Sequence, residues 1–507
     1  MALKIVLDGE TYLYDVEMPE QNADDFIYGW LLCKCRMIFD TMPHERIDIA
    51  GCEELSGALN VFASITQFTN KAIGVIEKGF AIGSKNVLFW NVSEDLRYKS
   101  LYDRLSKKSN IKYLNLELGF DRKLRKWKPT PLPMSVDALL KYIRENEIGK
   151  IVTVNSYVID KYLHETGINL VTVFEHIGVR LITIDNDPFD ITPTGFLRRL
   201  FLNSRFRFSN LSVLNEDFDK KNNVNAHYVA IPQGYGSEKP KELKDDYDVI
   251  VLSNSRFQNV KQVIKAIEIV MGGMKDKCQE INLWYLALRH LILNVFVIPE
   301  FRMQHYNAAL HQFYFACVQW LKYEIIKEIK TDREVKVYGD VGWNEVCPQY
   351  YKGSLGNDEI NRMYDEGNHL YLLLNASFSY LDASGPVYDV IRRRVQWINI
   401  PPMAKTKEFD GLGCVEYSGA ERLNELINNY TVDKGYGKSI GYYESILKSS
   451  VDDIENHVFG LPQKVSEFTR QRLKHKKIID RITKEYIDNN EPFLRHTYRR
   501  LFCEPGR

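Results

Sequence analysis

The sequence predicts an α/β protein made of two Rossmann-like, doubly wound domains that face each other across a cleft. Three observations lead to this prediction. Short segments rich in Val, Ile and Leu recur along the chain, amphipathic helical segments separate several of them, and a stretch rich in Pro, Gly and charge divides the chain. Apolar strands that alternate with helices are typical of parallel sheets covered on both faces.

The first half contains four apolar segments that are predicted to be strands of a parallel sheet. They are Leu3–Leu7, Val87–Asn91, Ile148–Val154 and Arg180–Ile184. Apolar residues at helical spacing predict a helix over Val136–Glu147, with Ser135 as its N-cap. We expect an N-terminal domain over residues 1–232, in which residues 1–80 are poorly assigned.

The segment Ile231–Lys244 has two Pro, two Gly and a cluster of charges, and it predicts an exposed hinge, placed at residues 233–246. A second domain is expected over residues 247–465. Its predicted strands are Tyr247–Leu252, Glu334–Tyr338, Leu370–Leu374, Val395–Ile400 and Cys414–Tyr417, with a helix over Val260–Val270. Residues 281–329 predict two inserted helices, and residues 466–507 a basic helical segment.

Composition and charge argue against several classes of protein. The 67 basic and 67 acidic residues balance, so no global field favours nucleic acid, and no nucleic-acid partner is expected. No apolar run approaches the roughly 20 residues of a membrane span, so no transmembrane segment is expected. The chain does not start like a secretory signal, and its eight cysteines form no C-x-x-C pair. We therefore expect a cytoplasmic protein with buried thiols.

Two polar segments follow predicted strands of the second domain. Ser253, Asn254, Ser255 and Arg256 lie between a strand and a helix, where backbone N–H groups and an arginine suit a phosphate; an N-cap turn with a surface arginine is the alternative. Gly339 closes the next strand and is followed by a loop with Lys352 and Gly353. Such a loop presents backbone to a planar base or a phosphate.

A third polar segment runs from Asn375 to Asp389, after an apolar strand. Ser384 and Gly385 precede a proline near the first turn of a predicted helix, and Gly385 allows close backbone approach to a ligand. Asp389 lies in that first turn. Its carboxylate either complements the helix dipole or accepts hydrogen bonds from ribose hydroxyls.

The pair Asp185 and Asp187 follows the predicted strand Arg180–Ile184. A D-x-D pair at a strand end can hold a divalent ion, but a carboxylate that faces the cleft without a metal is favoured here. The histidines do not cluster at metal-ligand spacing, and no metal site is predicted.

Taken in order, these segments resemble the two-Rossmann (GT-B) glycosyltransferases, and within them the CgeB-like spore-maturation group. Three places carry the resemblance over roughly residues 140–460: Gly178–Phe189 with the segment Leu211–Pro232 that follows it, Asp248–Arg256, and the series Lys336–Gly339, Tyr351–Leu355 and Asn375–Glu416. Residues 1–80 and the helices of 281–329 fall outside it. Where many GT-B enzymes carry two glutamates eight positions apart, this chain has Asp382 and Asp389, seven apart, and Tyr388 stands where an arginine is usual.

The resemblance implies a hexosyltransferase-like enzyme that moves a sugar from a nucleotide-diphosphate sugar to an acceptor hydroxyl on a carbohydrate, glycolipid or protein. It implies no cofactor: the nucleotide binds the second domain, with Ser255 and Arg256 at the diphosphate, Gly353 near the base and Asp389 at the ribose. Asp187 is the predicted general base. A metal-dependent transferase that uses Asp185 and Asp187, and a non-catalytic glycosyltransferase-like scaffold, remain the alternatives.

Overall fold

The structure is a computed structural model. It describes residues 2–7, 10–15, 47–49, 64–65, 67–92, 98–116, 120–121, 126–127, 132, 134–154, 157–185, 207–210, 226–228, 243–253, 267, 270, 281–296, 300–366, 368–374, 390, 395–400, 420–430, 445, 448–449, 451–461 and 467–503.

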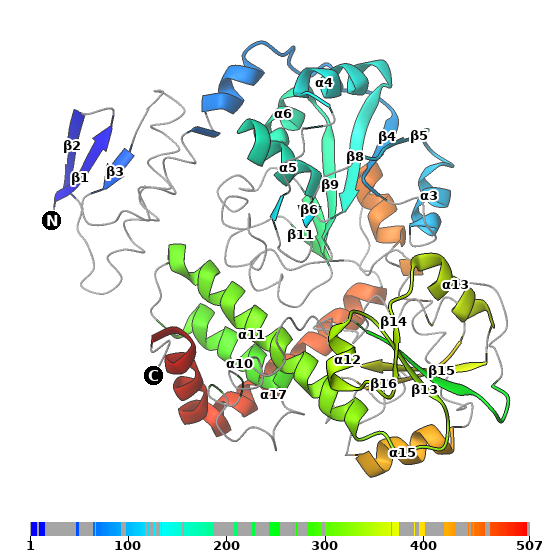
Figure 1. The fold of residues 1–507 in the computed structure, drawn as a ribbon. Coiled ribbons are helices and arrows are strands. Elements are labelled where there is room, and N and C mark those ends of the chain that lie inside the picture. Colours follow the sequence, from blue (N-terminus) through cyan, green and yellow to red (C-terminus); the bar gives the residue numbers. More distant parts are fainter. Residues whose placement is uncertain are drawn as a thin grey trace. The chain divides into compact units, whose positions relative to one another are not determined.

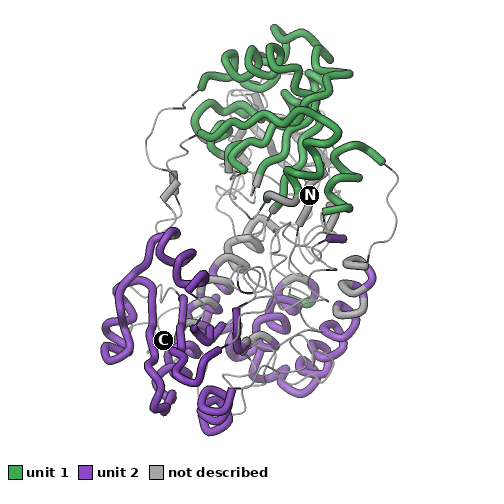
Figure 2. Tube along the Cα trace, turned by 90° about the vertical axis from the view of Figure 1, so that its right-hand side faces the viewer, with its two compact units in different colours: residues 1–232, 295–308, 451–464 green, residues 233–294, 309–450, 465–507 purple. Residues whose placement is uncertain are grey.

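The chain divides into two compact units (Figure 2). Unit 1 comprises Met1–Pro232, Val295–Ala308 and Val451–Lys464, and unit 2 comprises Gln233–Asn294, Ala309–Ser450 and Val465–Arg507. The first division, between Pro232 and Gln233, coincides with the start of the predicted hinge. Two later segments, both within the range expected for the second domain, belong to unit 1.

Unit 1 contains a six-stranded parallel sheet in the order β11-β10-β9-β8-β4-β5 (Figure 1). The strands are β4 (Asn86–Trp90), β5 (Ile111–Leu114), β8 (Ile148–Val154), β9 (Arg180–Asp185), β10 (Arg207–Asn210) and β11 (Ala226–Tyr228). Numbered within the sheet and read from β5, the order is 2-1-3-4-5-6, which extends the flavodoxin-like doubly wound order. The strands predicted near residues 87, 148 and 180 are confirmed.

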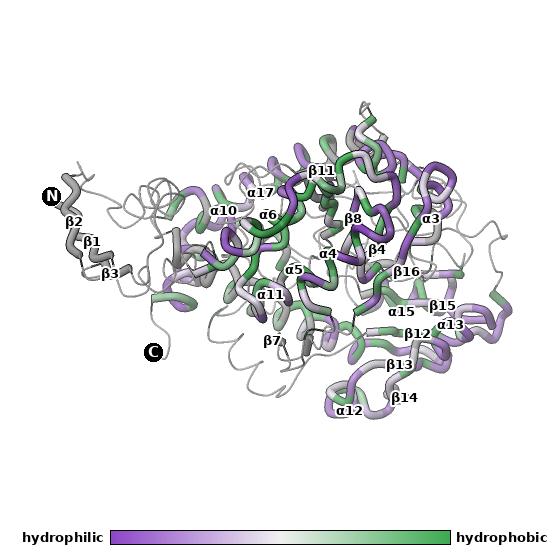
Figure 3. Tube along the Cα trace, turned by 90° about the horizontal axis from the view of Figure 1, so that it is seen from above, coloured by the Kyte–Doolittle hydropathy of each residue, from purple (hydrophilic) through white to green (hydrophobic). Residues whose placement is uncertain are grey.

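Both faces of the sheet are buried at β4, β8 and β9, which explains why these strands are mostly apolar without alternation. Leu88 and Trp90 of β4 pack in one core with α4 (Val136–Glu145), α5 (Tyr157–Thr166) and α6 (Leu170–Ile177). Val87 and Phe89 pack in a second core with α3 (Lys99–Leu105) and the helix of residues 451–459. Figure 3 shows α6 hydrophobic along most of its length. The predicted cap of α4 is confirmed, since the backbone N–H of Ala138 donates to Ser135 Oγ at 3.2 Å.

The prediction for Leu3–Leu7 was wrong in one respect. This segment is a strand, β1 (Ala2–Leu7), but it pairs antiparallel with β2 (Glu10–Asp15) and with β3 (Ile47–Ile49) in a separate three-stranded sheet. Leu7 pairs with Glu10, which leaves only Asp8 and Gly9 between the strands. An Asp-Gly dipeptide between apolar runs is a strong hairpin signal, and it outweighs the apolar composition that suggested a parallel strand.

Unit 2 contains a five-stranded parallel sheet in the order β14-β13-β12-β15-β16. Its strands are β12 (Asp248–Leu252), β13 (Val335–Tyr338), β14 (Tyr351–Gly353), β15 (His369–Leu374) and β16 (Gln396–Ile400). Numbered within the sheet, the order is 3-2-1-4-5, that of a Rossmann fold. Two parallel sheets with interleaved helices thus confirm the predicted α/β class.

The helices predicted within residues 281–329 and 466–507 are confirmed, whereas only residues 267 and 270 of the predicted helix Val260–Val270 are among the described residues. The two expected within residues 281–329 are α10 (Ile281–Asn294) and α11 (Glu300–Lys327), and the basic C-terminal segment forms α17 (Glu467–Tyr498), which packs against α10. A core on one face of the sheet joins α11, α12 (Gly342–Val346) and α15 (Ala420–Asn428) to β12 and β13. Tyr351–Gly353, expected to be a loop, is the edge strand β14 instead, and α13 (Asn357–Glu366) follows it.

Candidate functional site

The carboxyl edge of the unit 2 sheet has a topological switch between β12 and β15. These strands are neighbours in the sheet, yet β13 and β14 come between them in the chain. Connections from adjacent strands leave such a point in opposite directions, and open parallel sheets bind ligands there. Ser253 follows β12 at this edge, and in the sequence Asn375 is the residue after Leu374, the last residue of β15.

Ser253 is held by three hydrogen bonds. Its backbone N–H donates to the Tyr338 carbonyl at 3.0 Å, and its own carbonyl accepts from Trp343 Nε1 at 2.5 Å. Its hydroxyl accepts from Lys322 Nζ at 3.1 Å. Because Trp343 is fully buried, the first residue of the predicted phosphate loop is fixed to the core of unit 2.

Lys322 places an ammonium group at this edge, and the sequence analysis did not identify it. The residue lies on α11, in the segment set aside as a helical insertion, and its side chain is half-buried. A signal was present: Cys317, Val318, Trp320, Ile325 and Ile326 are buried around it, so a lysine in this run needs a specific reason to be there. A cation beside Ser253 is of a residue type that suits a phosphate group.

Gly339 meets the same loop from β13. A Cβ at this position would lie 1.9 Å from the Ser253 carbonyl oxygen, so only glycine allows the two connections to pass. Its N–H donates to the Gly353 carbonyl at 3.0 Å and is therefore used within the sheet. Gly353 has a φ of +102° and open space around it. Gly339 thus serves packing, while Gly353 leaves room beside β14.

The side chain of Lys352 does not point toward the carboxyl edge of the sheet. Its Nζ lies 3.4 Å from Glu334 Oε1, and Glu334 precedes β13. Lys336 Nζ lies 3.1 Å from Glu334 Oε2 and 2.6 Å from Asp248 Oδ2, at the start of β12. Hydrogen bonding to Lys336 is the main reason why the pKa of Glu334 is lowered. These ions form a network toward the amino ends of the strands, which binds the Lys352 side chain.

Most of the other predicted site residues lie outside the residues that the structure describes. They are Asp187, Asn254, Ser255, Arg256, Asn375, Ser384, Gly385 and Asp389. Asp185 ends β9, where its backbone pairs with Asn210, and its side chain is outside the description. Of the predicted set, the structure brings together Ser253, Gly339 and Gly353.

Within the described part of the chain, no three His, Cys, Asp or Glu side chains come together as a metal site requires. None of the helices described there is both long and apolar enough to cross a bilayer. Comparisons with family models, curated proteins and solved structures find no match. Two Rossmann-like sheets and the geometry at the switch point are therefore the basis for assigning a function.

Proposed function

We propose that this protein is a glycosyltransferase that moves a sugar from a nucleotide-diphosphate sugar to an acceptor hydroxyl, and that the nucleotide binds at the β12/β15 switch point of unit 2. The observation that carries the proposal is the Lys322 ammonium group on Ser253, at the switch point of a sheet with Rossmann order. The order of motifs that resembles the two-Rossmann glycosyltransferases supports it further.

The chemistry asks for positive charge where the diphosphate leaves. In the transfer, the bond between the sugar C1 and a phosphate oxygen breaks, and a bond between C1 and the acceptor oxygen forms. The acceptor proton passes to a base, and the diphosphate departs with the additional negative charge. Lys322, the backbone of the loop that starts at Ser253, and Arg256 would stabilise that charge without a metal ion.

The roles of the other site residues are proposed from their positions in the sequence. Asp389 would accept hydrogen bonds from the ribose, and Ser255 would contact the diphosphate beside Arg256. Asp187 would take the acceptor proton, with Asp185 as its neighbour. The metal-dependent alternative, in which Asp185 and Asp187 hold a divalent ion, differs in one clear respect: it needs the metal for turnover.

Binding of nucleoside diphosphates by calorimetry tests the location of the site. Lys322→Met should bind nucleoside diphosphates about ten- to a hundredfold more weakly, because it loses a charge-assisted contact worth roughly 1.5–3 kcal/mol. Lys327→Met is the matched control, because Lys327 is an exposed lysine on the same helix and should leave the affinity unchanged. Equal affinities for the wild type and both variants would show that the nucleotide does not bind at the switch point.

A further inference from the structure

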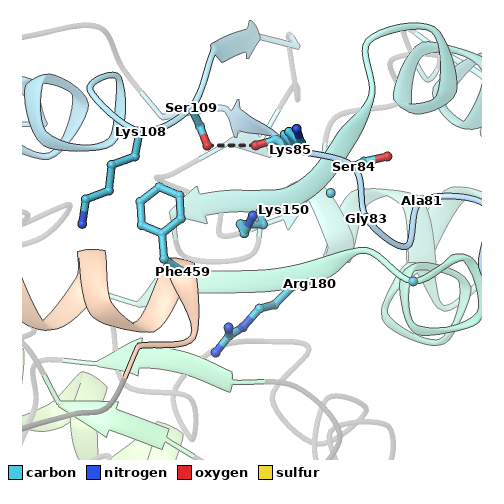
Figure 4. A pocket seen from close by; sticks show the side chains of 11 residues that line it. Ala81, Gly83, Ser84, Lys85, Lys108, Ser109, Lys150, Arg180 and Phe459 are labelled. Carbon is cyan, nitrogen blue, oxygen red and sulfur yellow. Dashed lines mark hydrogen bonds between the residues drawn. The ribbon is translucent and has the colours of Figure 1, made fainter.

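A basic cavity of about 480 Å³ lies at the amino edge of the unit 1 sheet, the edge opposite to the carboxyl ends of its strands. Lys85 precedes β4, Lys150 lies near the start of β8, and Arg180 is the first residue of β9. Lys108 and Phe459 line the cavity as well, and Figure 4 shows these side chains together. Among the described residues that line the cavity, four are cationic and none is a carboxylate.

The cations of this cavity repel one another. Lys150 and Arg180 are direct partners in the parallel register of β8 and β9, so two cations lie side by side. Like charges in that relation are destabilising. Burial, and then the charge of Arg180, lower the pKa of Lys150. In the part of the chain that the structure describes, no carboxylate forms an ion pair with Lys85 or Lys150.

Two features fix the cavity wall. The ring centroid of Phe459 lies 5.4 Å from both Lys108 Nζ and Lys150 Nζ, which orients the two ammonium groups around one aromatic ring. Lys108 Nζ also lies 2.6 Å from Glu455 Oε1, so its charge is balanced inside the protein. Lys85 and Lys150 therefore supply the charge that a ligand would neutralise, next to Arg180.

Packing explains two of the lining glycines, Gly149 and Gly178, whereas Gly83 has a φ of +88° with open space around it, so the glycines do not carry this argument. A Cβ on Gly149 would lie 2.1 Å from the Ser84 carbonyl oxygen, and a Cβ on Gly178 would lie 2.4 Å from Ile82 Cγ1. What calls for an explanation is three cations at the ends of adjacent strands around one cavity. The carboxyl ends of α4 and α6 offer a structural explanation, since cations are favoured there. That explanation predicts that the cations stabilise the fold.

We propose that this cavity binds a small molecule that carries two or more phosphate groups, with Lys85, Lys150 and Arg180 as its cationic contacts. The cavity volume suits a ligand of that size. Adjacent cations at fixed spacing suit neighbouring phosphates better than a single carboxylate. This site is independent of the nucleotide site proposed in unit 2, and it does not rest on the proposed function.

Calorimetric titration of the full chain with inorganic pyrophosphate tests the proposal. We expect the wild type to bind pyrophosphate, and we expect Lys150→Gln and Lys85→Gln each to bind it roughly tenfold more weakly or worse. Lys85 is exposed, so its replacement should not disturb the fold. Lys141→Gln, an exposed lysine of α4 outside the cavity, is the control and should bind like the wild type. Orthophosphate and nucleoside diphosphates, titrated in parallel, distinguish a free oligophosphate from a nucleotide as the source of the phosphates.

Two further results separate the explanations. Without ligand, Lys150→Gln should melt at the same temperature as the wild type or higher, because it relieves the repulsion from Arg180. A clear fall in melting temperature, together with unchanged pyrophosphate affinity in Lys85→Gln, would overturn the proposal in favour of a structural role. Pyrophosphate affinity that is lost in Lys322→Met but retained in Lys150→Gln and Lys85→Gln would also overturn it, since the anion would then bind in unit 2.

Discussion

At the scale of single residues, Gly339 tests the packing of the switch point. An alanine Cβ there would meet the Ser253 carbonyl oxygen at 1.9 Å, and backbone must move to relieve that contact. Gly339→Ala should therefore lower the free energy of unfolding by about 2 kcal/mol or more, as measured by denaturant titration. Gly356→Ala is the control, since its nearest neighbour would be Glu359 Oε2 at 3.4 Å, and it should cost at most about 1 kcal/mol. Equal losses in the two variants would contradict the steric account.

His369, the first residue of β15, gives a prediction about pH. Burial lowers its pKa below the ordinary 6.5, and Asp248 and Glu366 offset this only in part. Because the folded pKa lies below the unfolded pKa, protonation favours the unfolded chain. Stability should fall as pH drops below about 6.5, by at most about 1.4 kcal/mol per pH unit, and His369→Gln should remove this part of the slope. His290→Gln, at an exposed position, should keep it. Identical slopes for the wild type and His369→Gln would refute the assignment.

The residues of the candidate site show what local sequence can predict. Ser253 and Gly339 were identified because each directly follows an apolar strand, and strand ends are readable from composition. Lys322 was not identified, because it reaches the site from a helix 69 residues further along the chain. Lys352 was expected to face a ligand, but its partner Glu334 becomes its neighbour only once β13 and β14 pair. Contacts of this kind depend on tertiary structure and have no local signal.

At the scale of elements, the helix of residues 451–459 is attached to unit 1 by Glu455. Its carboxylate is almost buried and accepts hydrogen bonds from Arg104 Nε at 3.0 Å and from Lys108 Nζ at 2.6 Å. Arg104 also pairs with Asp452. Burial alone would raise the pKa of Glu455, but the bonds from Lys108 and Arg104 outweigh it, and the pKa is lowered.

Glu455→Gln should therefore destabilise the protein by about 1–3 kcal/mol at neutral pH. The folded pKa of Glu455 is below the unfolded 4.5, so this contribution is present above that pH and is lost as the pH falls further. The difference between wild type and variant should accordingly shrink in acid. Glu145→Gln removes an exposed ion pair with Lys141 and should cost less than about 0.5 kcal/mol. A Glu455→Gln protein as stable as Glu145→Gln would contradict this role.

Helices and strands were predictable where their own residues have a distinctive composition. The strands β8 and β15 were recognised from apolar runs, and the helices α10 and α11 from a stretch rich in Leu, Tyr and Phe and nearly free of Gly and Pro. The strand β1 was wrongly assigned to a parallel sheet because its apolar composition was given more weight than the turn that follows it. The Asp8-Gly9 dipeptide in that turn indicated a hairpin. The edge strand β14 has only three residues, too few for a pattern, and it exists because β13 offers it a pairing edge.

At the scale of the whole molecule, the partition of the chain makes a prediction about proteolysis. The first segment of unit 1 ends at Pro232, inside the Pro- and Gly-rich segment Ile231–Lys244, which we expect a protease to cut first. Such a cut leaves Val451–Lys464 on the C-terminal fragment, although it packs in the core of unit 1. The two fragments should therefore elute together in native size-exclusion chromatography and separate only in denaturant. Fragments that separate under native conditions would show that Val451–Lys464 does not bind the C-terminal fragment to the core of unit 1.

The first division falls at the start of the predicted hinge, while nothing in the sequence near residues 295–308 or 451–464 marks a return to unit 1. The apolar residues Val451, Ile454 and Val458 form an ordinary amphipathic pattern that fits any sheet face. Which sheet they cover depends on long-range packing, and the Glu455 contacts with Arg104 and Lys108 make that choice specific.

The most direct test of the central proposal is turnover of nucleotide-sugars by the full chain. Release of nucleoside diphosphate from a panel of nucleotide-diphosphate sugars should be measured with and without a chelator. The proposal predicts release from at least one of them that persists in the chelator and falls strongly in Lys322→Met but not in Lys327→Met. No release from any of them would contradict the assignment as a glycosyltransferase, and release that is lost in chelator and restored by manganese or magnesium would favour the metal-dependent mechanism.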